Sequence, residues 1–205
     1  MTPDKPFSPA CARNQQPILE LLRTHLGRAR SVFEIGSRNA QHAVHFAAAL
    51  PQLRWQCSDL AECLPAMRAW IDDARLPNLP PPLAYDVGDA PPPGVWDAVF
   101  SANTLHILAW PQVQQLFAAV ERLLGPAGLL IVYGAFNYGG RFTSASNAAF
   151  DRELRAADPR RGLRDFEAVD ALARAHGLAL VEDRALPANN RGLVWRRGGA
   201  PPPLR

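Results

Sequence analysis

The stretch Ser31-Val32-Phe33-Glu34-Ile35-Gly36 decides the fold of this chain. Its first five residues form a short, mostly apolar run, which is typical of a buried strand, and the glycine that follows allows a sharp turn. An Ala-rich segment from Gln41 to Leu50 comes next and stops at Pro51. This order predicts a strand, a turn and a helix.

The same unit recurs along the chain. Short apolar runs predict further strands over residues 53–57, 83–87, 98–102, 129–133, 178–183 and 193–196. Helical periodicity or composition predicts helices over 15–26, 60–74, 113–124, 147–157 and 166–176. Strands that alternate with helices favour an α/β fold, so we expect a Rossmann-like, seven-stranded, mostly parallel sheet with helices on both faces.

The bulk composition limits the class of protein. A length of 205 residues with 48% apolar composition favours a single domain over 1–205. The 22 basic and 19 acidic side chains leave a charge of only +3, which does not argue for a nucleic-acid partner. Residues 1–9 lack an apolar signal segment and no run is long enough to cross a membrane, so we expect a cytoplasmic protein.

The three cysteines, Cys11, Cys57 and Cys63, do not form a Cys-x-x-Cys pair. Their odd number argues against a disulfide framework, and no histidines stand at metal-ligand spacing beside them. We therefore expect reduced structural thiols and no metal site.

Gly36 and Glu34 are the first candidate site residues. A glycine between a strand and a helix lets a ligand approach the main-chain N–H groups at the helix N-terminus. Glu34 stands inside an otherwise apolar strand and needs a partner if it is buried. That partner is either a loop N–H or a cofactor cation, and a purely structural role, in which Glu34 braces the loop, is the alternative.

Acidic residues also end the next two strands. Asp59 lies 23 residues beyond Gly36, close to the spacing of about 20 at which a carboxylate accepts from both ribose hydroxyls. Capping of the following helix is an equally simple role for Asp59. Asp86 could bind an adenine amino group while Val87 packs on the ring, although Asp also opens many loops.

The fourth strand is followed by Asn103 and His106, at the edge of the sheet where open α/β folds bind ligands. His106 is a candidate general base near neutral pH. A structural hydrogen-bonding role is the alternative for a lone histidine at a helix entrance.

With these residues in place, the chain resembles class I S-adenosylmethionine-dependent methyltransferases, and more closely a methyltransferase-like family formerly catalogued as a domain of unknown function. The resemblance covers nearly the whole length. The residues that carry it are Ser8-Pro9-Ala10, Arg13-Asn14, Gln16 to Leu19, Phe33 to Ser37, Gln41-His42-Ala43, Trp55-Gln56, Ser58-Asp59, Asn103, His106-Ile107, Tyr133-Gly134, Thr143-Ser144, Ser146-Asn147, Phe150-Asp151, Gly162, Arg164-Asp165 and Pro187 to Asn190.

The resemblance implies S-adenosylmethionine as cofactor, held at Glu34, Gly36 and Asp59, with Asp86 and Val87 near the adenine and Asn103 near the methionine moiety. It also implies that residues 1–30 form a helical segment over the pocket. Arg13, Asn14, Asn189 and Asn190, with the loop over residues 133–144, would then bind a small polar methyl acceptor. Tyr133 and His106 are the candidates for proton handling.

The chain departs from the family pattern in the loop itself, where Arg38, Asn39 and Ala40 replace Gly, Thr and Gly. The Arg38 side chain could fill cofactor space, or its guanidinium could pair with the methionine carboxylate. The changed loop keeps a second hypothesis open, a degenerate member that binds a nucleoside-like ligand or a protein partner without catalysis. A nicotinamide-dependent oxidoreductase is less consistent, because the Gly-x-Gly-x-x-Gly spacing is absent. Residues 198–205 are expected to be a flexible tail.

Overall fold

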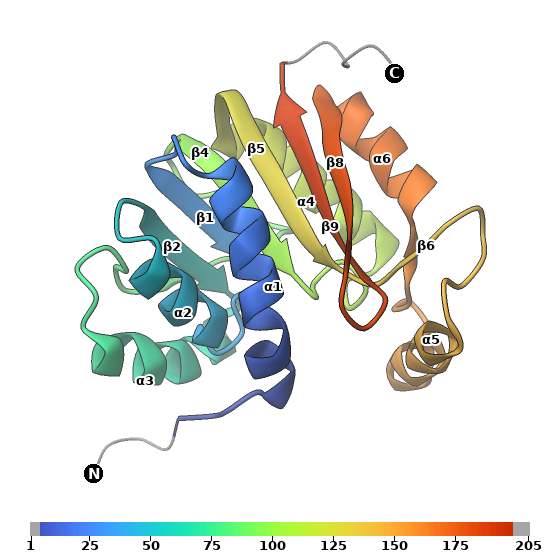
Figure 1. Ribbon diagram of the computed structural model, residues 1–205, viewed down its shortest axis with the longest axis horizontal. Helices are drawn as coiled ribbons and strands as arrows, with labels where there is room; N and C mark the ends of the chain where they lie inside the picture. The colour runs from blue at the N-terminus through green and yellow to red at the C-terminus, as the bar shows by residue number, and fades with distance from the viewer. Residues whose placement is uncertain (1–4, 199–205) are drawn as a thin grey trace.

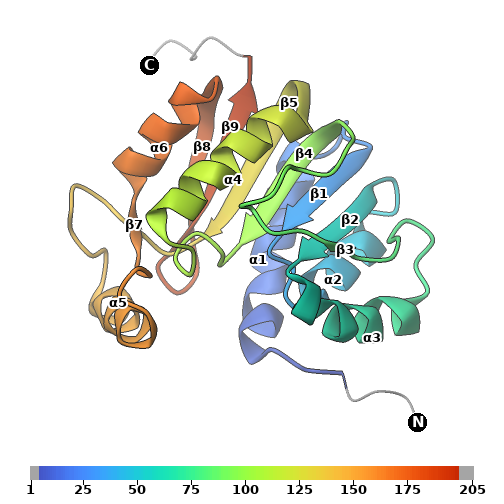
Figure 2. The same cartoon turned by 180° about the vertical axis from the view of Figure 1, so that it is seen from behind.

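The computed structural model describes residues 5–198, which build a seven-stranded sheet with helices on both faces (Figures 1 and 2). The strands, in spatial order, are β3 (Leu83–Ala84), β2 (Arg54–Asp59), β1 (Ser31–Ile35), β4 (Trp96–Ala102), β5 (Leu124–Gly134), β9 (Asn190–Arg197) and β8 (Leu178–Leu186). Strand β9 runs opposite to the other six strands of this sheet, which are parallel to one another. The predicted Rossmann-like, mostly parallel sheet with helices on both faces is confirmed.

Two helical layers cover the sheet. The helices α1 (Pro9–His25), α2 (Gln41–Ala49) and α3 (Leu64–Ala74), with the short 3-10 turn η1 (Ala61–Cys63), cover the face seen in Figure 1. The helices α4 (Trp110–Leu123) and α6 (Phe166–Ala175) cover the face seen in Figure 2, and α5 (Ala145–Ala157) lies beyond the end of the sheet.

Strand β1 shows why both faces are buried. Successive side chains of a strand point to opposite faces. Val32 accordingly joins the core beneath α1, α2 and α3, while Phe33 and Ile35 join the core beneath α4 and α6. A strand buried on both sides reads as a continuous apolar run, which is how it was predicted.

The parallel strands all end at one edge of the sheet, which we call the carboxyl edge; it is the lower edge in Figure 1. Because β5 and β8 both run antiparallel to β9, the turn between β8 and β9 also lies at this edge. Helix α1 begins there as well, and α5 lies near it (Figure 1). Residues far apart in the sequence are therefore brought to one edge.

Several elements differ from the sequence prediction. Strand β3 ends at Ala84 instead of residue 87, because Asp86 opens a turn in which its Oδ1 accepts from the backbone N–H of Gly88 at 2.9 Å. Helix α1 begins earlier than predicted, because the Ser8 hydroxyl caps it by accepting from the Cys11 N–H. Pro17 therefore lies inside the helix rather than in its first turn.

Beyond β5 the predicted loop contains a short strand. β6 (Phe136–Asn137) pairs in parallel with β7 (Arg164–Asp165), in a second, two-stranded sheet. This pairing joins the segment after β5 to the segment before α6. The predicted tail lies outside the described residues from residue 199 onward, as do residues 1–4 of the N-terminal segment.

Candidate functional site

The turn between β1 and α2 contains three residues in left-handed backbone conformations, which favour glycine. Gly36, Arg38 and Ala40 have positive φ angles of 80°, 53° and 62°. Such a conformation costs a residue with a Cβ about 1–2 kcal/mol. A Cβ at Gly36 would lie 2.4 Å from the Thr104 hydroxyl oxygen, so this position requires glycine where the turn passes the segment after β4. Arg38 and Ala40 thus occupy backbone conformations in which glycine is favoured.

The end of β2 holds this turn by hydrogen bonds to its backbone. The Asp59 carboxylate accepts from the Arg38 N–H at 2.6 Å and from the Leu60 N–H at 2.7 Å. The Ser58 carbonyl accepts from the N–H groups of Gly36 and Ser37, both at 3.1 Å. Three predicted cofactor residues, Gly36, Arg38 and Asp59, are therefore brought together. The Arg38 side chain itself is exposed.

Glu34 is buried on the α2 side of the sheet, with 2% of its surface exposed. Its carboxylate accepts from the Trp55 indole N–H at 2.8 Å. Burial raises the pKa of Glu34 to about 7, and hydrogen bonds from Trp55 and Ser37 oppose that shift. Trp55 of β2 thus gives the buried Glu34 a structural partner, and the predicted contact of Glu34 with the cofactor stays a prediction.

The N-terminal segment lies across the first turn of α2. The Asn39 side chain donates to the Pro6 carbonyl at 2.6 Å. The Gln41 amide exchanges two hydrogen bonds with the backbone of Ser8, at 2.8 and 3.2 Å. The Trp70 indole N–H of α3 also donates to the Pro6 carbonyl, at 3.0 Å. This segment is thereby fixed beside the candidate cofactor turn.

Asn14 of α1 contacts both His42 and Tyr133. Its side-chain oxygen lies 2.6 Å from His42 Nε2. Burial raises the pKa of the nearby Tyr133 phenol, while a hydrogen bond with Asn14 lowers it. Asn14 and Tyr133, predicted for substrate binding and proton handling, are thus neighbours, whereas Arg13 is exposed.

Asn103, His106 and Gly134 meet at the carboxyl ends of β4 and β5. The Asn103 N–H donates to the Tyr133 carbonyl at 2.8 Å. A Cβ on Gly134 would lie 3.8 Å from His106 Nδ1 and 3.9 Å from the Asn103 side-chain oxygen. Burial, and to a smaller extent the charge of Arg164, lowers the pKa of His106 to about 4. Its imidazole is therefore neutral at pH 7.

Residues of α5 and of the segment before α6 hold the His106 turn in place. The Gly162 N–H donates to the His106 carbonyl at 2.9 Å, and the Phe150 ring packs edge-on against the imidazole at 5.0 Å. The Arg164 guanidinium donates to two backbone carbonyls of the same turn. Asp151 in turn accepts from the Leu163 N–H at 2.7 Å. Several residues that carried the family resemblance therefore support His106.

Asp86 and Val87 lie after β3. Asp86 uses one carboxylate oxygen to stabilise its own turn, as described above. Val87 is buried and belongs to the core beneath α4. These contacts give both residues a structural role, and their predicted contact with an adenine ring stays a prediction.

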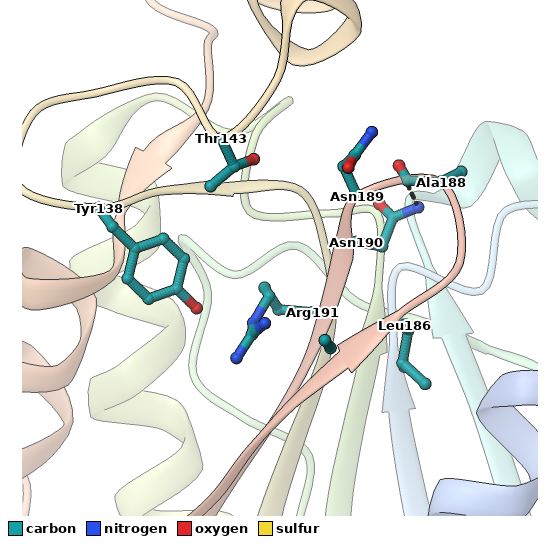
Figure 3. A pocket seen from close by; sticks show the side chains of 8 residues that line it. Tyr138, Thr143, Leu186, Ala188, Asn189, Asn190 and Arg191 are labelled. Atoms are coloured by element: carbon teal, nitrogen blue, oxygen red, sulfur yellow. Dashed lines mark hydrogen bonds between the residues drawn. The ribbon is translucent and has the colours of Figure 1, made fainter.

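A cavity of about 460 Å³ opens at the carboxyl edge, beside the turn between β8 and β9 (Figure 3). The residues that line it include Tyr138, Thr143, Leu186, Asn189, Asn190 and Arg191. The two predicted substrate residues of this turn, Asn189 and Asn190, are thus cavity residues. Asn189 is connected to α5, because its carbonyl accepts from the Asn147 side chain at 3.1 Å.

Sequence reasoning missed the charged pair at this cavity. The Tyr138 hydroxyl donates to the Asp183 carboxylate at 2.9 Å, and Arg191 Nε donates to the same carboxylate at 2.7 Å. Arg191 directly follows Asn190 in the sequence, and Tyr138 stands in the polar and aromatic loop that was noted. Asp183 gave no local signal, since it was predicted only as the end of a strand.

Two negative findings apply to residues 5–198. No helix in that part of the chain is long and apolar enough to cross a membrane. No group of three or more His, Cys, Asp or Glu side chains among those residues is arranged to hold a metal ion.

Solved methyltransferase structures share this fold. An O-methyltransferase family protein from Burkholderia thailandensis superposes with a TM-score of 0.81, at 22% identity over 92% of this chain. The S-adenosylmethionine-dependent methyltransferase SibL gives 0.78 at 24% identity over 92%. Human N-acetylserotonin methyltransferase, in complex with S-adenosylmethionine, gives 0.76 at 15% identity over 93%. This chain spans only 57%, 55% and 53% of those three chains.

Comparison of the sequence with family models identifies the family of this chain. A family model matches residues 5–197, which include the turn after β1, the His106 turn and the cavity residues. The chain therefore belongs to the family described as "Protein of unknown function (DUF938)".

Proposed function

We propose that this protein is an S-adenosylmethionine-dependent methyltransferase that acts on a small polar molecule. The observation that carries the proposal is the turn over residues 36–40. Its backbone keeps left-handed angles at Arg38 and Ala40 against the preference of both residues, and Asp59 stands at the end of the neighbouring strand. Strained backbone that persists at a ligand-binding edge supports a functional role.

The residues at this edge fit the chemistry of the cofactor. Asp59 has a carboxylate suited to a ribose diol, and the N–H groups at the start of α2 suit a carboxylate. The exposed Arg38 guanidinium could add a second, bidentate contact to that carboxylate. Asp86 and Val87 would lie near the adenine, and Asn103 near the methionine moiety.

The cofactor, when bound, supplies an activated methyl group on a sulfonium. The protein then has to bind the acceptor, hold it in line and exclude water, and alignment of this kind can supply much of the rate. His106 is neutral and buried, so it would orient the acceptor through a hydrogen bond and accept its proton only weakly. Burial raises the pKa of Tyr133, so its phenol stays protonated and would act as a donor.

Titration calorimetry with S-adenosylmethionine tests the first half of this proposal. We expect binding to the wild type, and binding about tenfold weaker or worse for Asp59→Asn, because a hydrogen-bonded charge is lost. No heat with the wild type, combined with binding by Arg38→Gly, would show that Arg38 blocks the pocket. No heat with either protein would remove the proposal.

Methyl transfer itself is tested with metabolite extracts, scored by release of S-adenosylhomocysteine. The double variant His106→Ala/Tyr133→Phe should bind the cofactor and lose turnover. Unchanged turnover in that variant would discard proton handling by either residue.

One observation favours a second function, the binding of a nucleoside-like ligand or a protein partner without catalysis. Asn39, which replaces a Thr of the family pattern, is committed to the Pro6 carbonyl, so the N-terminal segment is tied directly to the changed loop. Mass spectrometry of the purified protein for a bound nucleotide, together with the extract screen, separates the two functions.

A further inference from the structure

We propose that the cavity beside the β8–β9 turn binds the methyl acceptor, and that this acceptor is an uncharged molecule that presents N–H or O–H groups. The inference deepens the proposed function and rests on it. A cavity of about 460 Å³ is within the range used for small-molecule ligands. Figure 3 shows Tyr138 and Thr143 on one side of it and Asn189, Asn190 and Arg191 on the other.

Arg191 is the charged side chain among the residues that line the cavity, and its partner Asp183, which is not one of them, neutralises its charge. Arg191 and Asp183 form an ion pair at 2.7 Å, with side-chain exposures of 26% and 21%. The Tyr138 hydroxyl donates to both oxygens of Asp183, at 2.9 and 3.1 Å, so the carboxylate is almost fully used. Arg191 also packs its guanidinium over the Tyr138 ring, at 5.5 Å from the centroid.

A charged ligand would therefore lose water in this cavity without gaining an unpaired counter-charge, which is unfavourable. Arg141 of the adjoining loop and Glu167 at the start of α6 are both exposed to solvent, where their fields are screened. The electrostatics thus select against both anions and cations.

Apart from the guanidinium of Arg191, which bonds to Asp183 through Nε and Nη2, the polar side-chain atoms of the cavity that stay available are mainly acceptors. The Asn190 amide nitrogen donates to the carbonyls of Pro187 and Ala188, and the Asn189 amide nitrogen donates to the Ser146 hydroxyl. Within residues 5–198, no hydrogen bond uses the side-chain oxygen of Asn189 or Asn190. These two oxygens can accept N–H or O–H donors from a ligand.

Thr143 supplies the complementary group. Its hydroxyl oxygen accepts from the Asn147 side chain at 2.8 Å, which leaves the hydroxyl hydrogen free to donate. Two carbonyl acceptors and one hydroxyl donor fit an uncharged amide or hydroxy compound. Leu186 provides an apolar wall for the rest of such a molecule.

Three probes of similar size test this selectivity: benzamide, benzoate and benzylammonium. Their binding is followed by NMR chemical-shift titration of the Asn189 and Asn190 side-chain amide signals. We expect benzamide to bind the wild type at least about fivefold more tightly than either ion, since each ion meets a neutralised wall. Equal or tighter binding of an ion, or no shift of these signals with benzamide, would overturn the proposal.

Two variants that each remove one member of the Arg191–Asp183 ion pair test the charge preference directly. Asp183→Asn leaves Arg191 unpaired and should make benzoate the preferred probe. Arg191→Gln leaves Asp183 unpaired and should make benzylammonium the preferred probe. The double variant is neutral again and should restore the preference for benzamide, which keeps the test decisive if one single variant fails to fold.

Glu182→Gln is the matched control, because it removes a neighbouring carboxylate of β8 that pairs instead with Arg184 and with His25 of α1. The order of the three probes should not change in this variant. An unchanged order in both Asp183→Asn and Arg191→Gln would also contradict the proposal. None of these measurements needs the cofactor, so their failure is distinguishable from a failure of S-adenosylmethionine binding in the calorimeter.

Discussion

The turn after β1 and the cavity beside β8 and β9 lie at the same carboxyl edge but are built in different ways. The turn is held by its own backbone N–H groups, since those of Gly36 and Ser37 donate to the Ser58 carbonyl and that of Arg38 donates to the Asp59 carboxylate. The cavity residues Tyr138 and Arg191 are held by side-chain contacts, since both donate to the Asp183 carboxylate from separate segments. The hydrogen bonds of the turn fix its backbone conformation, and those at the cavity fix the net charge of its ion pair.

This difference explains which changes each region tolerates. The donors in the turn are backbone N–H groups, which every residue except proline has, so they do not depend on which side chains stand at positions 38 and 40. The cavity has no such protection, because one substitution at Asp183 or Arg191 changes its net charge. This difference would suit a turn that binds a cofactor common to many proteins of the fold and a cavity that binds an acceptor specific to each, because one fold can carry different sites.

The largest effect expected in the turn comes from Gly36→Ala. The new Cβ would lie 2.4 Å from the Thr104 hydroxyl oxygen, in a backbone conformation with φ of +80°. Strain and overpacking together should lower the free energy of unfolding by about 4 kcal/mol. Urea unfolding followed by circular dichroism measures this loss.

Gly139→Ala is the matched control at the cavity loop. Its φ is +55°, and nothing lies within 4 Å of an added Cβ. Only the backbone cost of about 1–2 kcal/mol is then expected. Equal losses in the two variants would mean that the close approach of Gly36 to Thr104 contributes nothing, and Thr104→Ala should partly rescue Gly36→Ala.

Glu34→Gln is expected to change the free energy of unfolding in a pH-dependent way, by somewhat less than Gly36→Ala does. Burial raises the pKa of Glu34 from its ordinary 4.5 to about 7, so the folded protein holds a proton that the unfolded chain releases. Stability from this group is fully present below pH 4.5 and is lost as pH rises through 7. Glu34→Gln should therefore stabilise the protein by on the order of 2–3 kcal/mol at pH 8 and hardly at all at pH 4.5.

Unfolding free energies of both proteins at the two pH values check this. His42 and His106, whose pKa values burial lowers to about 4, titrate in the same range with the opposite sign. Both histidines are present in wild type and variant, so the difference between the proteins isolates Glu34. A stabilisation that is the same at both pH values would mean that Glu34 is not protonated in the fold.

The fold could be predicted from the sequence because its signals are local. The apolar run of β1, the glycine after it and the recurrence of this unit all act over a few residues. Predictions failed where a side chain redirected the backbone. Asp86 ended β3 early by accepting from the Gly88 N–H, and the Ser8 cap started α1 before the expected residue.

The candidate site was predicted only in part, because local sequence signals do not show contacts between distant segments. Gly36, Asp59, Asn103 and His106 follow strands, so the parallel sheet was sufficient to bring them to one edge. Arg191 and Asp183 are joined across a hairpin whose register no local pattern specifies. The sequence also could not show that Glu34 would be satisfied by the Trp55 indole from β2.

A smaller effect is expected from Arg164→Gln, which removes the group that holds the His106 turn. Loss of charged hydrogen bonds to the turn should lower the free energy of unfolding by about 1.5–2 kcal/mol. The pKa of His106 should rise slightly above its value of about 4, because the charge of Arg164, the smaller of its two causes, is removed while burial, the larger cause, remains. NMR titration of the imidazole signals measures that shift.

Arg160→Gln serves as the control, because Arg160 pairs with Asp158 at an exposed position. Neither the stability nor the pKa of His106 should change measurably. An unchanged free energy of unfolding in Arg164→Gln would show that the turn does not need its guanidinium.

The smallest effect is expected from Arg38→Gly. Glycine relieves a left-handed strain of about 1–2 kcal/mol at φ of +53° and loses roughly 0.5–1 kcal/mol in unfolded-state entropy, so a net stabilisation of about 0.5–1 kcal/mol should result. Arg75→Gly is a close match, since Arg75 is also exposed and has a φ of +50° at the end of α3. Equal gains would mean that the Arg38 side chain adds nothing to the free protein. A gain in Arg75→Gly alone would show that the Arg38 side chain stabilises the turn before any ligand binds, and the turn would then depend on side chains as the cavity does.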